Sequence, residues 1–326
     1  MKRSHVLSAG VVFVFLLLIP AVVQTDYGLQ VLFRIFLFAA LGLAWNLVGG
    51  YSGQLSLGHA AYFGAGAYGL ALFSMKLGIS PWLAVLMGVA VALVCALLIG
   101  GVSFRLRGPY FALSTIAFAE ILRLTAKNLP TVTGGDVGAQ VPALFHGNVN
   151  RSFYLAAVAL TAAAFAITVL ISRSRFGYYL MAIREDEDTA LSVGIGTAQT
   201  KLAALLISAA LTAVAGALYG SIFLFIVPDQ VLALDVSNEI AIVAMLGGAG
   251  TIAGPMVGSI VLETASEVFK NTFKEAHQLI FGILLVVVVL FLPEGIVGTL
   301  NRYVTSAFRR TNPIPSNPPE AGSHGQ

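Results

Sequence analysis

Long apolar runs, repeated along the chain, constrain this sequence more than any other feature. A helix that crosses a bilayer needs about 20 predominantly apolar residues, and runs of about that length recur from residue 7 to residue 297. Only 10% of the residues are charged and 58% are hydrophobic, whereas about 25% of a soluble globular chain is charged. We therefore expect an all-α fold, a polytopic helical bundle of the inner membrane.

Ten apolar segments are expected from the distribution of polar residues. They are 7–23, 29–48, 57–75, 81–103, 108–126, 152–172, 202–226, 237–247, 253–269 and 278–297. The eighth is too short to cross a hydrocarbon core of about 30 Å as a straight helix. Alternatively, the eighth and ninth segments together form one broken span. The expected number of spans is therefore eight to ten.

The basic residues predict how the bundle is oriented. With the N-terminus inside and ten spans, the inside loops hold eleven of the 18 Lys and Arg residues and the outside loops five. Cytoplasmic loops carry the excess of Lys and Arg, so both termini are expected in the cytoplasm. Segment 173–201 then lies inside and loop 127–151 in the periplasm. Because the basic residues occupy short separate loops, we expect no nucleic-acid partner.

Segment 173–201 is a polar island between two apolar runs. Residues 182–191 are good helix formers, and Ile183, Leu191 and Val193 can share one side of a short amphipathic helix. Gly194 and Gly196 are expected to end it. Such a helix on the cytoplasmic side can dock a soluble partner, and the alternative is a solvated loop helix.

Two glycine-rich stretches interrupt the apolar pattern, at 46–59 and 247–255. Non-helical backbone at membrane depth survives only where it is buried in protein or lines a cavity. Paired breaks in the two halves of a transporter indicate an internal repeat around a transport path. The alternative is a pair of cytoplasmic turns with close helix packing, which the small-residue spacing of Gly250, Gly254 and Gly258 favours for the second stretch.

Charged residues also lie within the apolar runs. Glu120 and Arg123 are three residues apart and are expected to form an intramembrane ion pair. Arg34 lies near the outer end of its segment and is expected to extend toward the membrane surface. His59 has no second His or Cys at ligand spacing, so no metal site is expected.

The sequence contains no recognisable catalytic motif. A P-loop requires a Lys that GGAGTIAGP (247–255) lacks, and there is neither an HExxH motif nor a nucleophile elbow. We therefore expect neither an enzyme nor a bound cofactor, and any ATP must be bound by another subunit.

An ordered set of motifs resembles the LivM-type permease subunit of branched-chain amino acid ABC importers, and less closely its urea and short-amide relatives. The motifs are WNLVGGYSGQLSLGHAAYFGAGAYG (45–69), LRGPYFALSTIAFAEILR (106–123), TGGDVG (133–138), AIREDEDTALSVGI (182–195), KLAALLISAALTAVAGALYG (201–220), LGGAGTIAGPMVG (246–258) and FLPEGIVG (291–298).

The resemblance implies a permease domain (1–303) that works with a second, LivH-type permease, two ATPase subunits and a periplasmic binding protein. A cytoplasmic helix of such a permease seats in a cleft of the ATPase. The positions implied for ATPase coupling are Ala182, Arg184, Glu185, Asp186, Ala190 and Gly194, and those near the binding protein are Thr133, Gly134, Gly135 and Asp136.

Polar residues of the first glycine-rich stretch are the candidates for the translocation path. They are Asn46, Tyr51, Gln54, Ser56 and His59. The tail 304–326 is rich in Pro, Gly and Ser and is expected to be disordered. Three alternatives stay open: a urea or amide permease, a proton-coupled secondary transporter that uses Glu120 or Glu239, and an intramembrane enzyme.

Overall fold

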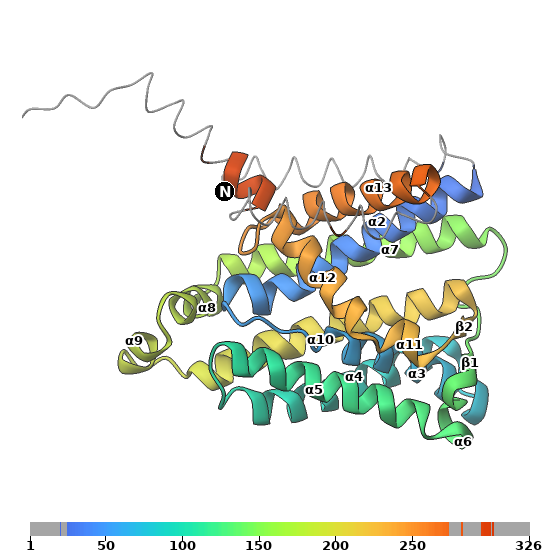
Figure 1. Ribbon diagram of the computed structural model, residues 1–326, viewed down its shortest axis with the longest axis horizontal. Coiled ribbons are helices and arrows are strands. Elements are labelled where there is room, and N and C mark those ends of the chain that lie inside the picture. Colours follow the sequence, from blue (N-terminus) through green and yellow to red (C-terminus); the bar gives the residue numbers. More distant parts are fainter. Residues whose placement is uncertain (1–19, 21–24, 274–281, 283–294, 301, 303–326) are drawn as a thin grey trace, which may run out of the picture.

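The computed structural model describes residues 20, 25–273, 282, 295–300 and 302 (Figure 1). The tail 304–326 lies outside these residues, and so do the segments 7–23 and 278–297 almost entirely. Within the described residues the fold is helical apart from one two-stranded sheet, which confirms the all-α prediction.

Eight of the expected apolar segments fall in the described part, and each corresponds to helix. The long helices are α2 (Asp26–Asn46), α3 (His59–Leu77), α4 (Pro81–Ser103), α5 (Pro109–Lys127), α7 (Val149–Ser172), α10 (Thr197–Phe223), α12 (Leu234–Gly247) and α13 (Gly254–Phe273). The short elements are the π-helical turn η1 (Leu47–Tyr51), α6 (Pro130–Thr133), the 3-10 turn η2 (Gly135–Val137), β1 (Ala139–Gln140), α8 (Arg175–Glu185), α9 (Glu187–Ser192), β2 (Phe225–Ile226) and α11 (Pro228–Val231).

Five stretches among the described residues are long and apolar enough to cross a membrane. They are Asp26–Tyr51, Pro81–Ser103, Val149–Ser172, Thr197–Phe223 and Pro228–Gly247. The last of these corrects the span assignment: α11 extends the eighth segment at its N-terminal side, and the ninth forms the separate 20-residue helix α13. The two segments therefore do not combine into one broken span.

The helices pack closely because small residues lie at their crossings. α10 packs on α3 and α4, and α2 on α7 and α13. A Cβ at Gly66 of α3 would overlap the backbone of Ala213, and one at Gly216 of α10 would overlap the backbone of Phe63. Glycine at these positions lets the two backbones approach each other, as is common between helices in lipid.

The elongated bundle has two distinct ends (Figure 1). α8 and α9 lie at one end, here named the coupling end, whereas α6, β1 and β2 lie at the other, the distal end. The 27-residue helix α10 joins them, because it begins at Thr197 after α9 and ends at Phe223 before β2. β1 pairs antiparallel with β2, with Ala139 opposite Ile226, so the distal loops after α5 and α10 are held together.

Candidate functional site

The first glycine-rich stretch is only partly non-helical, which corrects the prediction for 46–59. Asn46 ends α2 and residues 47–51 continue it as a π-helical turn. The irregular backbone is restricted to residues 52–58, here named the re-entrant stretch. π-helical turns within α-helices occur frequently at functional sites.

The re-entrant stretch runs back into the bundle beside α2. The indole Nε1 of Trp45 donates to the carbonyl oxygen of Ser56 at 2.7 Å, and the backbone N–H of Leu57 donates to Thr115 Oγ1 at 3.1 Å. Side chains from α2 and α5 thus satisfy backbone groups that a helix would have satisfied internally. This is the protein-buried setting in which irregular backbone is tolerated in membranes.

The coupling segment (173–201) forms two helices, whereas one helix was predicted over 182–191. Asp186 separates α8 from α9, with an extended backbone at φ −159°. Its Oδ1 accepts a 2.5 Å hydrogen bond from the backbone N–H of Thr189 and thereby caps α9. This hydrogen bond holds the pKa of the Asp186 carboxyl below its usual value. Gly194 ends α9 as predicted, in the left-handed conformation (φ +86°).

Arg184 connects the coupling segment to both glycine-rich stretches. Its Nη1 donates to the carbonyl oxygen of Gly50 at 2.7 Å. The side chain of Asn46 donates to the carbonyl oxygen of Thr251 at 2.8 Å and accepts from the N–H of Gly250 at 2.7 Å. The two breaks, some 200 residues apart in sequence, therefore meet directly beside α8. We name Asn46, Gly50, Arg184, Gly250 and Thr251 the junction.

Buried charge fixes α9 against the bundle. Lys201 lies in α10 with only 1% of its side chain exposed, and its Nζ donates to Glu187 at 2.6 Å. The same ammonium lies 5.2 Å from the ring centroid of Phe104, within range of a cation–π interaction. The exposed pair Arg107–Asp188 adds a 2.8 Å contact from the loop after α4, and the hydrogen bond raises the pKa of Arg107.

The six predicted coupling positions differ in their environments. Glu185 and Asp186 are exposed, Ala182 is half-buried and Ala190 is buried. Arg184 and Gly194 are exposed as well, although the guanidinium of Arg184 reaches the backbone of Gly50. Next to the acids, Leu191 and Val193 expose 55% and 73% of their surface, whereas Ile183 on α8 is buried. The expected common apolar side of these three residues is therefore not formed, because the kink at Asp186 separates Ile183 from the other two.

The predicted pathway residues are mostly buried and paired with protein groups. His59 Nε2 lies 2.8 Å from Ser208 Oγ, and its Nδ1 lies 3.3 Å from Ser56 Oγ. Tyr51 is 4% exposed and Asn46 is fully buried. Gln54 is partly exposed. Asn46, Ser56 and His59 thus help to hold the re-entrant stretch and the junction in this conformation.

At the distal end, Thr133, Gly134, Gly135 and Asp136 form a tight turn. Thr133 Oγ1 donates to the carbonyl oxygen of Leu129 at 2.9 Å, and both glycines adopt positive φ angles. Asp136 exposes 74% of its side chain and pairs with Lys127 at 3.1 Å. The segment between α5 and α7 is thus a structured cap with α6, η2 and β1 rather than a simple loop.

The predicted pair Glu120–Arg123 is present, at 2.5 Å, within a larger network. Arg123 also pairs with Asp229 of α11, and Lys127 reaches the same carboxylate at 2.9 Å. The network joins α5 to α11 and, through Asp136, to the distal turn.

Sequence reasoning missed a second charged cluster. Arg34, which was predicted to extend toward the membrane surface, pairs with two carboxylates of the bundle: its Nη2 lies 3.1 Å from Glu263 of α13 and 4.0 Å from Glu239 of α12. Glu263 is 4% exposed and its Oε1 has no hydrogen-bond partner among the described residues. The available signal was a carboxylate within the apolar run 253–269, which usually marks a functional site.

Comparison with known proteins places this architecture in a family. A family model described as "Branched-chain amino acid transport system / permease component" matches residues 27–289. This range covers the re-entrant stretch, the junction and the coupling segment. The chain belongs to the branched-chain amino acid permease family.

Curated relatives agree with this assignment. The high-affinity branched-chain amino acid transport system permease protein LivM of Salmonella typhimurium is 30% identical over 288 residues, which cover 80% of this chain and 67% of the relative. LivH of Escherichia coli is 28% identical and BraD of Pseudomonas aeruginosa 27%, each over 80% of this chain and 91% of the relative. No solved structure matches the chain significantly. The permease is therefore a multi-pass membrane protein whose relatives are transport subunits.

Proposed function

We propose that this chain is the LivM-type permease subunit of an ABC importer for branched-chain amino acids. It would pair with a LivH-type permease and receive its substrate from a periplasmic binding protein. ATP would be bound by separate ATPase subunits. The family match supports the transport role, and the junction supports a mechanism in which an external subunit drives the bundle.

The single observation that carries this proposal is the contact of Arg184 with Gly50. The acids of the coupling segment and its apolar residues Leu191 and Val193 are exposed, so a cytoplasmic ATPase subunit can dock on them. Arg184 on the adjacent helix α8 binds the backbone of Gly50 in η1, the turn that follows α2. Movement of α8 with a docked ATPase would therefore be transmitted to both breaks of the junction.

The distribution of charge supports a cytoplasmic coupling end. The two loops at this end, 104–108 and 173–196, carry Arg105, Arg107, Arg173, Arg175 and Arg184, as the positive-inside rule requires of the cytoplasmic side. The distal turn with Asp136 would then face the periplasm and the binding protein. Opening and closing of the re-entrant stretch would expose Gln54 and its neighbours to the translocation path.

Reconstitution in proteoliposomes tests the proposal. The complete complex is expected to import leucine only with ATP and a loaded binding protein, and an ATPase subunit with an inactivated catalytic site serves as the control. Uptake that persists without ATPase subunits and collapses with the proton gradient would instead favour a secondary transporter. Import of urea or short amides in preference to leucine would contradict the substrate assignment.

A further inference from the structure

A cavity of about 250 Å³ lies at the distal half of the bundle, between α2, α3, α10, α11 and α12. Phe38 and Phe63 form its buried part, with 5% and 2% of their surface exposed, whereas Phe223 is 54% exposed. The cavity is therefore open on the side of Phe223 and closed toward the core. Drug-sized ligands occupy pockets of roughly 300–1,000 Å³, so this smaller volume suits a molecule of the size of an amino acid.

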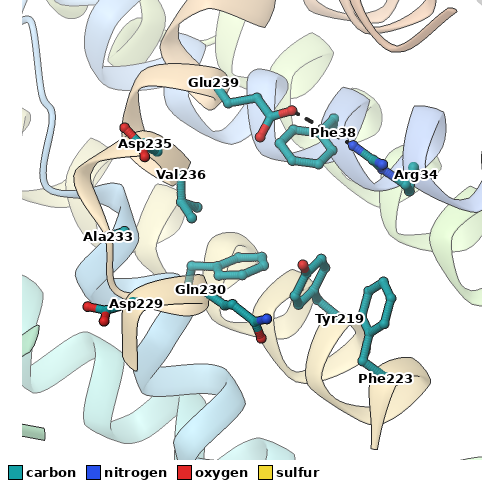
Figure 2. Close-up of a pocket in the computed structure, with 11 residues that line it drawn as sticks. Arg34, Phe38, Tyr219, Phe223, Asp229, Gln230, Ala233, Asp235, Val236 and Glu239 are labelled. Atoms are coloured by element: carbon teal, nitrogen blue, oxygen red, sulfur yellow. Dashed lines mark ion pairs between the residues drawn. The ribbon is translucent and has the colours of Figure 1, made fainter. Parts of the chain in front are cut away.

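The charged edge of the cavity has more negative than positive groups. Arg34 and Glu239 both line it (Figure 2), but the guanidinium of Arg34 lies closer to Glu263 (3.1 Å) than to Glu239 (4.0 Å). One cation thus serves two carboxylates. Farther along α13, the opposite charges of Lys270 and Glu267 act on Glu263 in opposite senses. The lining itself holds Asp229, Asp235 and Glu239 with Arg34. Asp229 is paired with Arg123 and Lys127, and Glu239 is the lining carboxylate that lies beside Arg34.

The opposite edge is aromatic. Figure 2 shows Tyr219, Phe223 and Gln230 across the cavity from Arg34 and Glu239. The rings of Phe63 and Tyr219 have centroids 5.2 Å apart, and those of Tyr219 and Phe223 4.7 Å apart. These rings form a continuous apolar wall for an aliphatic side chain, and their faces also attract a nearby ammonium group.

From this arrangement we propose that the cavity is the receiving site for the transported amino acid, an inference that rests on the import function proposed above. Glu239 accepts the α-ammonium group, and the N–H groups of Arg34 not used by Glu263 bind the carboxylate, since a guanidinium carries five donors. The branched side chain lies against Phe38, Phe63 and Tyr219. A ligand with both charges and an apolar side chain thereby satisfies each edge of the cavity.

The position of the cavity fits delivery from outside. Asp229 and Gln230 on its rim belong to α11, and Lys127 connects Asp229 to the distal turn because it pairs with both Asp229 and Asp136. A binding protein seated on that turn would be joined to the cavity rim through these ion pairs. The site is thus adjacent to the surface from which substrate is proposed to arrive.

The first test compares Glu239→Gln with Glu267→Gln in the complete reconstituted complex. Loss of a charged partner in a hydrogen bond costs about 1.5–3 kcal/mol, so we expect Glu239→Gln to lower the leucine imported per ATP hydrolysed by about tenfold or more. Glu267→Gln removes the same charge at a position outside the cavity lining, and it is expected to change the leucine imported per ATP hydrolysed by less than twofold. An equal amount of leucine imported per ATP hydrolysed in both variants and in the wild type would overturn the proposal.

A second pair of variants tests the volume without altering charge. Val236→Trp fills the cavity and is expected to abolish most leucine uptake, whereas Leu234→Trp, at an exposed position of the same helix outside the cavity lining, is expected to retain it. Wild-type uptake by Val236→Trp would overturn the proposal.

If one of these variants fails to assemble, labelling of a cysteine at the mouth of the cavity tests the site directly. Phe223→Cys places a thiol at the mouth of the cavity, while the native Cys95 is buried. Excess L-leucine is expected to slow labelling of this thiol by a membrane-impermeant reagent, and unchanged labelling would count against the site. If the wild-type complex imports no branched-chain amino acid, the proposed import function is wrong. If the wild-type complex imports leucine and these variants import it equally well, only the proposed binding site in the cavity is wrong.

Discussion

Arg184 Nη1 lies 2.7 Å from the carbonyl oxygen of Gly50, so a side chain of α8 holds the backbone of η1, the turn after α2. The two residues are 134 positions apart in sequence. Gly250 completes the contact from the second break, because its backbone packs against both. The junction thus links α8 to both breaks, which is the contact on which the proposed coupling rests.

Replacement of Arg184 by alanine is expected to uncouple transport from ATP hydrolysis. A hydrogen bond from a charged group is worth about 1.5–3 kcal/mol, which is about tenfold or more in a coupled equilibrium. Leucine imported per ATP should fall by about that factor while the ATPase subunits still co-purify. Arg175→Ala, at the other end of the same helix and exposed, is the matched control. Loss of ATPase binding in Arg184→Ala would instead place Arg184 in the docking surface.

Gly250→Ala is expected to disrupt the same junction from the opposite side. Gly250 has a φ of +83°, and a Cβ there would overlap the Arg184 guanidinium. The left-handed conformation alone costs a non-glycine residue about 1–2 kcal/mol. We expect a lower Tm and reduced uptake for the complex.

Gly101→Ala provides the control for this change. Gly101 lies in α4, and a Cβ there would meet nothing within 4 Å. Alanine is favoured over glycine in a helix by roughly 0.5–1 kcal/mol, so Tm should stay the same or rise slightly. A Tm for Gly250→Ala equal to that of Gly101→Ala would show that the junction does not require glycine.

Periodicity and composition predicted the helices well because apolar runs of spanning length have few other solutions in lipid. The eighth segment was mistaken because Pro228 and Asp229 ended the apolar pattern early, although α11 continues the span through them. The kink at Asp186 was missed because the segment was read as one run of helix formers, although Asp is also a favoured N-cap residue. The start of α9 is shown only by the structure, in which the Asp186 carboxylate caps α9 by accepting a hydrogen bond from the N–H of Thr189.

Contacts between residues far apart in the chain could not be predicted from the sequence. The pair Glu120–Arg123 was found because its members are three residues apart on one helix. The contacts of Arg34 with Glu263 and of Asn46 with Gly250 join positions more than 200 residues apart, and nothing local encodes them. Charge within an apolar run was the usable signal, and it was applied to Glu120 but not to Glu263.

Lys201 and Glu187 are expected to show strong energetic coupling. Lys201 is almost completely buried, and removal of one partner of a buried ion pair leaves an uncompensated charge, which costs about 3–5 kcal/mol when both are fully buried. Because Glu187 is 21% exposed, we expect about 2 kcal/mol for Lys201→Met and more for Glu187→Gln.

The double variant Lys201→Met/Glu187→Gln should recover most of this loss, since no unpaired charge remains. Thermal unfolding and protease cleavage between residues 186 and 196 measure the effect in the purified complex. The exposed pair Arg107–Asp188 supplies the comparison, and its removal is expected to have little effect. Strictly additive losses at Lys201 and Glu187 would contradict the predicted coupling.

The cap at Asp186 should make α9 sensitive to acid. The pKa of Asp186 is lowered mainly by the hydrogen bond from Thr189, so the carboxylate stabilises the folded segment fully above its ordinary value near 3.8. This stabilisation is lost as the pH falls through the lower, folded-state pKa. Protease cleavage at 186–196 should therefore stay constant from pH 7 to about 4 and rise below that. Asp186→Asn, which still caps, should remove the pH dependence and keep the protection, whereas Asp186→Ala should be cleaved at every pH. An acid-induced rise of equal size in Asp186→Asn would assign the transition to another group.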